Sequence, residues 1–131
     1  MQKHIGPLII ILAFSFVGMK ALFHPDLFTA HDIWHQIARL YHYQNALNGG
    51  QFPPYWISNL SNGFGYPLFF FSYHLPWLLG LPLLFAGLGI PATIKTLFVL
   101  SYLLSGIFMY SLAFSIFKSR MAGLLAGILY L

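Results

Sequence analysis

The sequence predicts an all-α integral membrane protein: three transmembrane helices, a truncated fourth, and an amphipathic interfacial helix in the first loop. Of its 131 residues, 59% are hydrophobic and only 6% are charged, whereas soluble domains carry roughly a quarter charged residues. So much apolar surface cannot be kept from water in so short a chain, but a bilayer is itself an apolar solvent. The apolar residues also form long runs between short polar segments. We therefore expect an integral membrane location.

Composition also excludes several classes of protein. The chain has no cysteine, so a disulfide framework and a thiolate metal site are both ruled out. The net charge is +4, but the six Lys and Arg residues are scattered singly, without the basic patch that binds nucleic acid. Single cations at the ends of apolar runs are typical of residues that meet lipid headgroups.

The first two predicted spans cover residues 5–23 and 64–89. Lys20 lies near the end of the first and can extend its amine to the interface. No small-residue cleavage site precedes Lys20, which favours an uncleaved span over a signal peptide. The second span contains three prolines (Pro67, Pro76 and Pro82), so residues 63–76 are alternatively a broken or re-entrant segment.

The third predicted span covers residues 91–117, with Pro91 suited to a first helical turn. A tight turn at Lys118–Arg120 leads to a fourth apolar run, residues 121–131. Eleven helical residues cover about 16 Å of a bilayer core about 30 Å thick. We therefore expect the chain to be the N-terminal piece of a longer protein. The alternative is a short final helix packed within the bundle.

The loop of residues 24–62 contains the densest polar cluster, and its periodicity predicts a helix. Thr29 is the expected N-cap, Asp32 the acidic residue of the first turn, and Gly49 with Gly50 the end. At 100° per residue an apolar face and a polar face separate. The apolar face comprises Ile33, Trp34, Ile37, Leu40 and Tyr41, and the polar face His31, His35, Arg39 and His42. Such a helix is expected to lie on the membrane surface.

The polar face has two interpretations. In the first it is an active-site wall, where Asp32 accepts a proton and Arg39 holds an anionic leaving group. His31 and His35 could then hold a divalent metal ion together with Asp32, although this spacing is common. In the second it is an ordinary hydrated face. His74 is a further ionisable group near a span, where such groups tend to be functional.

The order of these features resembles a known family. His31-Asp32-x-x-His35 is followed by Asn48-Gly-Gly-Gln-Phe-Pro-Pro-Tyr-Trp56 and by Gly63-Phe-Gly-Tyr-Pro-Leu-Phe-Phe-Phe71. This pattern is similar to the N-terminal region of polytopic GT-C-type glycosyltransferases, in particular the YfhO-like membrane proteins. The resemblance covers essentially the whole chain, but only the first third or less of a family member.

The resemblance implies a fragment of a membrane glycosyltransferase that moves a sugar from a polyprenyl-phosphate donor to an extracytoplasmic acceptor. Asp32 would be the catalytic base, and His31, His35, Arg39 and His74 would bind substrate. Many relatives have an acidic pair where this chain has His31 and Asp32, so a divalent metal cofactor stays open. The implied partners are membrane lipid, the lipid-linked sugar donor and the rest of a longer chain.

The family's topology places residues 24–62 outside the cytoplasm. Three spans then also place Lys118 and Arg120 outside, against the positive-inside rule. Two other functions fit the sequence. One is a transporter or flippase that uses the broken second span and His74, and the other is a non-enzymatic membrane scaffold.

Overall fold

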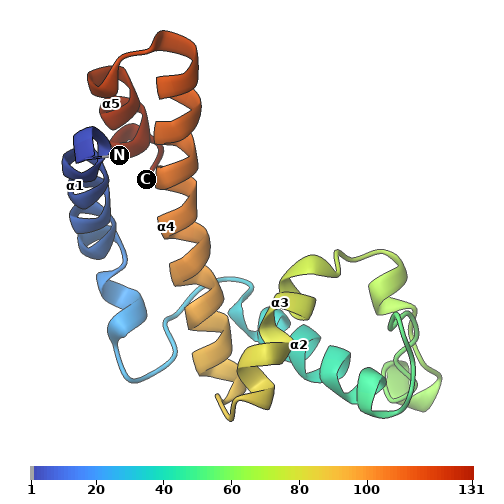
Figure 1. Cartoon of the computed structure of the whole chain (residues 1–131). Coiled ribbons are helices and arrows are strands. Elements are labelled where there is room, and N and C mark those ends of the chain that lie inside the picture. Colours follow the sequence, from blue (N-terminus) through green and yellow to red (C-terminus); the bar gives the residue numbers. More distant parts are fainter. Residues whose placement is uncertain (1) are drawn as a thin grey trace. The chain divides into compact units, whose positions relative to one another are not determined.

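The computed structural model describes residues 2–131, and this part of the chain is helical (Figure 1). The α-helices are α1 (Gln2–Gly18), α2 (Ile33–Asn48), α3 (Leu75–Phe85), α4 (Ile90–Phe117) and α5 (Arg120–Tyr130). Short 3-10 turns lie at Lys20–Phe23, Ser61–Gly63 and Leu68–Phe70. An isolated antiparallel bridge joins Ile57 to Tyr66. The predicted all-α class is confirmed.

The chain divides into two compact units. Unit 1 comprises the residues up to Phe28 together with Phe98–Leu131, and unit 2 comprises Thr29–Leu97. Unit 1 therefore contains α1, most of α4 and α5. Unit 2 contains α2, α3 and the long connection between them, and it holds every residue that the sequence marks as a candidate for chemistry.

In unit 1, α1 runs antiparallel to α4. His4, near the start of α1, packs its ring against Phe114 with centroids 4.6 Å apart, and it contacts Tyr110 as well. At the other end of α1, Gly18 faces the side chain of Tyr102, where a Cβ atom would collide with the phenol. The start of α1 and the end of α4 are consequently at the same end of the unit.

Helix α5 packs on α1 and α4 through small residues. A Cβ atom on Gly127 would lie 2.7 Å from Cδ1 of Ile11 and 3.0 Å from the carbonyl oxygen of Gly106. One on Gly123 would lie 2.9 Å from the ring of Tyr110. Glycine lets helix backbones approach closely, which is a common packing device between apolar helices. The fourth apolar run is thus a short helix packed within unit 1.

Residues 91–117, predicted as the third span, lie in one long helix. Helix α4 has 28 residues and, among the described residues, is the one helix long and apolar enough to cross a membrane. It begins one residue earlier than predicted, with Pro91 in its first turn. In the first apolar run, α1 ends at Gly18 and the rest forms a 3-10 turn.

The prediction of one helix over residues 64–89 is wrong. Helix α3 covers only the second half of this range, and its 11 residues span about 16 Å. The preceding segment is non-helical because Gly63 and Gly65 adopt φ values of +89° and +84°, in the left-handed region that a right-handed helix does not use. Pro67 further disfavours helical backbone at the residue before it, and Pro76 lies in the first turn of α3. The alternative of a broken segment describes this region correctly.

Candidate functional site

Helix α2 carries most of the predicted site, and its start differs from the prediction. The N-cap residue is Asp32, with φ −107°, so Thr29 is not the cap and Asp32 precedes the first turn. The backbone N–H of Ile33 donates to the carbonyl of Ala30 in a turn, and the α-helix begins only at Ile33. The predicted end is confirmed, because Gly49 is the C-cap and donates its N–H to the carbonyl of Asn45.

The buried face of α2 is also rotated from the predicted one. Ile33, Leu40 and Tyr43 are buried, whereas Trp34 and Tyr41 are 71% and 47% exposed. Helix α3 explains the difference, because it packs against α2 and approaches Leu40 through a glycine, Gly80. The placement of α3 therefore decides which aromatic side chains of α2 are covered.

At the start of α2, two imidazoles approach one carboxylate oxygen. Nδ1 of His31 lies 2.8 Å from Oδ1 of Asp32, and Nδ1 of His35 lies 3.8 Å from the same oxygen. The side chain of Asp32 is 64% exposed, and those of His31 and His35 are 97% and 69% exposed. This arrangement is an exposed carboxylate beside two imidazoles, and both kinds of group can act in general acid–base catalysis.

The predicted metal set was His31, Asp32 and His35. In the described part of the chain, no group of three or more His, Cys, Asp or Glu side chains is placed to hold a metal ion. Both imidazoles direct a nitrogen at the same carboxylate oxygen, and that arrangement suits proton transfer better than shared coordination of an ion.

Arg39 lies about one turn beyond His35 on α2. Its Nη1 donates to Oε1 of Gln36 at 3.5 Å, and the hydroxyl group of Tyr73 donates to the same oxygen at 3.5 Å. Gln36 thus connects the predicted cation to the segment that leads into α3. The guanidinium remains partly exposed.

His74 lies in an aromatic cluster with Tyr43, Tyr55 and Phe69. Its Nδ1 atom is 3.3 Å from the hydroxyl group of Tyr43, and its ring meets those of the other three members at centroid distances between 5.7 and 6.1 Å. Burial, and then the neighbouring Tyr55, raise the pKa of Tyr43, so its hydroxyl group keeps its proton. The predicted site residues therefore lie in three places: His74 in this cluster, Arg39 beside Gln36, and His31 and His35 beside Asp32.

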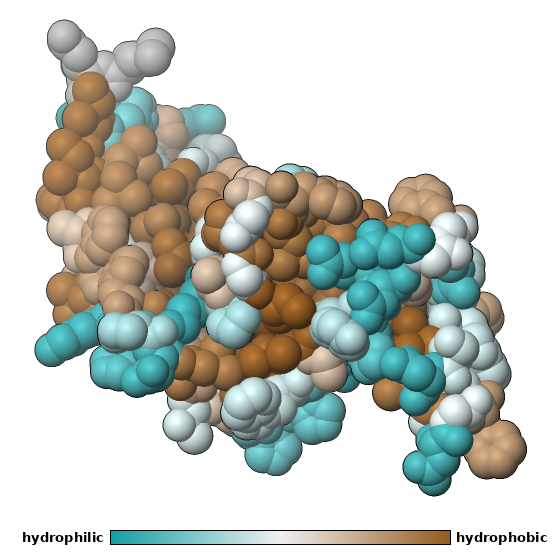
Figure 2. Space-filling model, turned by 90° about the horizontal axis from the view of Figure 1, so that it is seen from below, coloured by the Kyte–Doolittle hydropathy of each residue, from teal (hydrophilic) through white to brown (hydrophobic). Residues whose placement is uncertain are grey.

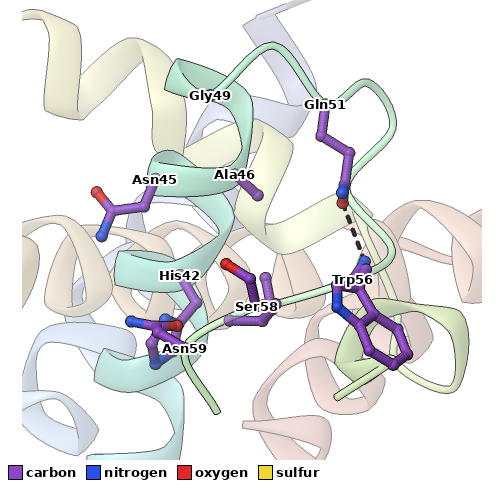
Figure 3. Close-up of a pocket in the computed structure, with 9 residues that line it drawn as sticks. His42, Asn45, Ala46, Gly49, Gln51, Trp56, Ser58 and Asn59 are labelled. Carbon is purple, nitrogen blue, oxygen red and sulfur yellow. Dashed lines mark hydrogen bonds between the residues drawn. The ribbon is translucent and has the colours of Figure 1, made fainter. Parts of the chain in front are cut away.

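A pocket of about 340 Å³ lies between the C-terminal half of α2 and the returning chain (Figure 3). Its lining comprises His42, Asn45, Ala46, Gly49, Gln51, Trp56, Ile57, Ser58 and Asn59. Of these, only His42 was a candidate from the sequence. Asn45 and Asn59 were not predicted from the sequence, because they line the same pocket only when the chain folds back on α2.

Gln51 holds the returning chain in place. Its side-chain Oε1 accepts the backbone N–H groups of Tyr55 at 2.5 Å and Trp56 at 3.0 Å, and the second bond is drawn in Figure 3. Its own backbone N–H donates to the carbonyl of Ala46 at 3.0 Å. One side chain therefore closes the turn that forms the pocket wall.

Comparisons with protein-family models, with curated proteins and with solved structures find no match to this chain.

Proposed function

We propose that this chain is the membrane-integrated N-terminal part of a GT-C-type glycosyltransferase, with Asp32 as general base. The substrates would be a polyprenyl-phosphate-linked sugar and an extracytoplasmic acceptor. One observation carries the proposal: the Asp32 carboxylate is exposed, lies 2.8 Å from one imidazole and 3.8 Å from another, and belongs to the N-cap residue of the α-helix that follows the first apolar helix.

Membrane integration rests on unit 1. Only 17% of the most apolar stretch of α4 is buried, unlike the core helix of a soluble protein. Side chains such as Val17, Phe108 and Ile116 are 76%, 64% and 63% exposed, and Figure 2 shows hydrophobic residues over much of one face. Apolar surface of this extent suits contact with lipid.

The antiparallel pairing of α1 and α4 supports a two-span arrangement. Helix α1 has 17 residues, about 25 Å long and near the shortest length that spans a bilayer core. Helix α3 is too short to span. In the proposal, α1 and α4 cross the membrane and unit 2 lies at the outer interface.

The layout suits a lipid-linked donor, whose anomeric carbon must react at the membrane surface. A base has to reach an acceptor hydroxyl group within about 3 Å, and an exposed carboxylate at the start of a helix allows that approach. The imidazoles of His31 and His35 and the guanidinium of Arg39 would contact and stabilise the departing phosphate. We assign no step to a metal ion.

The test compares Asp32→Asn with Asp26→Asn. Each variant is made in the full-length protein that contains residues 1–131 and is assayed in membranes. Asp32→Asn removes the basicity and keeps the size, so transfer from a polyprenyl-phosphate sugar should fall by about 10²- to 10⁴-fold. Membrane insertion should not change, because the carboxylate is exposed. Asp26→Asn should cost much less. Equal transfer by wild type and Asp32→Asn would refute the assignment.

A transporter is the second candidate, and the contact of His74 with Tyr43 favours it. The pair is part-buried, and His74 directly follows an irregular segment of backbone. Ionisable groups in substrate paths through membranes are often placed in this way. The discriminating experiment measures proton-coupled flux in proteoliposomes. Flux that survives Asp32→Asn and is lost in His74→Phe would favour transport over transfer.

A further inference from the structure

We propose that the pocket between α2 and the chain of residues 51–59 is a binding site for a neutral saccharide about the size of one hexose. The pocket measures about 340 Å³, at the lower end of the range for small-molecule sites. Two walls enclose it. His42 and Asn45 lie on the helix, and Ser58 and Asn59 lie on the chain that returns beside it (Figure 3).

The lining is polar but carries no formally charged group. Its side chains include three amides, a hydroxyl, an imidazole and an indole, and no Lys, Arg, Asp or Glu. Amides and hydroxyls both donate and accept hydrogen bonds, as the hydroxyl groups of a sugar require. A phosphate or carboxylate ligand would normally be met by Arg or Lys, so the lining selects for a neutral ligand.

His42 supports the same selection. Burial lowers the pKa of its imidazole from the usual 6.5, so the ring is neutral at pH 7 and offers one donor and one acceptor. A protonated imidazole would instead present two donors and attract an anion. His42, Ser58 and Asn59 all line this one pocket (Figure 3).

Trp56 also lines the pocket, and its position is fixed from two sides. Its backbone N–H is held by Gln51, 3.0 Å from Oε1. Its indole lies directly against Gly65, where φ is +84° and any Cβ atom would collide with the ring. The residue remains 48% exposed, so part of the indole surface is available. An amphipathic ring of this kind can cover the C–H face of a sugar.

The pocket is separate from the Asp32 carboxylate. Asn45 lies about 20 Å further along α2 at 1.5 Å per residue. A saccharide in the pocket is therefore not the sugar that reacts at Asp32, and its binding does not depend on the proposed transfer. The ligand would be either a free saccharide or a remote sugar of a lipid-linked glycan, since both present the same neutral ring.

The test is saturation-transfer NMR on the intact protein in lipid nanodiscs. D-glucose and N-acetyl-D-glucosamine are the neutral probes, glucose 1-phosphate is the anionic probe, and polyprenyl-phosphate glucose in the nanodisc is the lipid-linked probe. Neutral sugars should bind. Asn45→Leu and Asn59→Leu should each weaken binding about tenfold, the effect of losing one or two hydrogen bonds. Asn48→Leu, on the same helix outside the lining, should leave the affinity unchanged. Preference for the lipid-linked probe over free glucose would identify the lipid-linked source.

A second measurement does not depend on how the leucine variants fold. The chain has no cysteine, so Ser58→Cys places a single thiol in the pocket wall and Asn48→Cys a matched thiol outside it. A neutral sugar should slow maleimide labelling of the first and not the second. No protection at Ser58→Cys, or binding of glucose 1-phosphate alone, would overturn the proposal.

These outcomes also separate the two proposals. If Asp32→Asn abolishes transfer and no sugar protects Ser58→Cys, only the pocket assignment fails. If sugar protects Ser58→Cys but Asp32→Asn transfers normally, only the proposed catalytic role fails.

Discussion

The hydroxyl group of Tyr110 lies 2.6 Å from Nδ1 of His4, and this contact joins α4 to α1. Tyr110 is only 3% exposed, and the ring of His4 also packs edge-on against Phe114. In surroundings this apolar, a hydrogen bond is strong and an unpaired polar atom is costly. The pair is therefore a polar tie between α1 and α4 within unit 1.

Tyr110→Phe should destabilise unit 1. The change leaves the imidazole of His4 without this partner, which should lower the free energy of unfolding by about 1 to 3 kcal/mol. Thermal or denaturant unfolding in detergent, followed by circular dichroism, measures the effect. Tyr130→Phe, at a residue 59% exposed, should change it by less than about 0.5 kcal/mol. Similar losses in both variants would show that the contact with His4 contributes nothing.

Gly127→Ala should disturb the packing of α5. A Cβ atom there meets Ile11 at 2.7 Å and backbone at 3.0 Å, and overpacking of this kind costs about 1 to 3 kcal/mol. Gly6→Ala is the matched control, because nothing lies within 4 Å of its Cβ position and alanine favours helix over glycine by about 1 kcal/mol. The two substitutions should shift the melting temperature in opposite directions. A higher melting temperature for both would contradict the close approach at Gly127.

The helices could be predicted where composition alone decides. Residues 91–117 form one long apolar run whose proline falls in the first turn, and α4 follows it closely. Residues 64–89 are about as apolar, but hydropathy does not reveal the backbone conformation. At the start of this range, Gly63 and Gly65 adopt left-handed conformations that a right-handed helix does not use. Glycine and proline therefore decide the backbone conformation there, although the side chains are hydrophobic.

The candidate site shows the same division. His31 and Asp32 are adjacent and His35 lies one helical turn on, so their proximity follows from local geometry. The contact of His74 with Tyr43 joins residues 31 positions apart and depends on how α3 packs on α2. The pocket depends on the path of the chain after Gln51, which no periodicity encodes.

Stability should depend on pH through His42. Burial lowers the pKa of this imidazole below its usual 6.5, so below about pH 6.5 the unfolded chain binds a proton that the folded chain does not. The contribution of His42 to stability is thus fully present above pH 6.5 and is lost as the pH falls below it. Melting temperatures between pH 8 and pH 5 should therefore fall more steeply for wild type than for His42→Gln. A steeper fall for the variant would reverse the assigned direction of the shift.

The two-span arrangement also changes the charge balance of the topology. With three spans, Lys3 and Lys95 lie inside and four cations lie outside, against the positive-inside rule. With α1 and α4 as the crossing pair, Lys118 and Arg120 join Lys3 inside. Lys20 and Arg39 remain outside and Lys95 moves outside, so the cations are equally divided. The charge count no longer opposes an external unit 2.

Cysteine labelling distinguishes the two topologies, and the cysteine-free chain allows single thiols. Ser58→Cys, in unit 2, should react with an impermeant maleimide in intact cells. Ser119→Cys, in the turn between α4 and α5, should react only after permeabilisation, because α4 returns the chain to the cytoplasm. Three spans would instead expose both thiols outside. Labelling of Ser119→Cys in intact cells would therefore refute the two-span arrangement, and labelling of Ser58→Cys only after permeabilisation would place Asp32 on the side opposite to an extracytoplasmic acceptor.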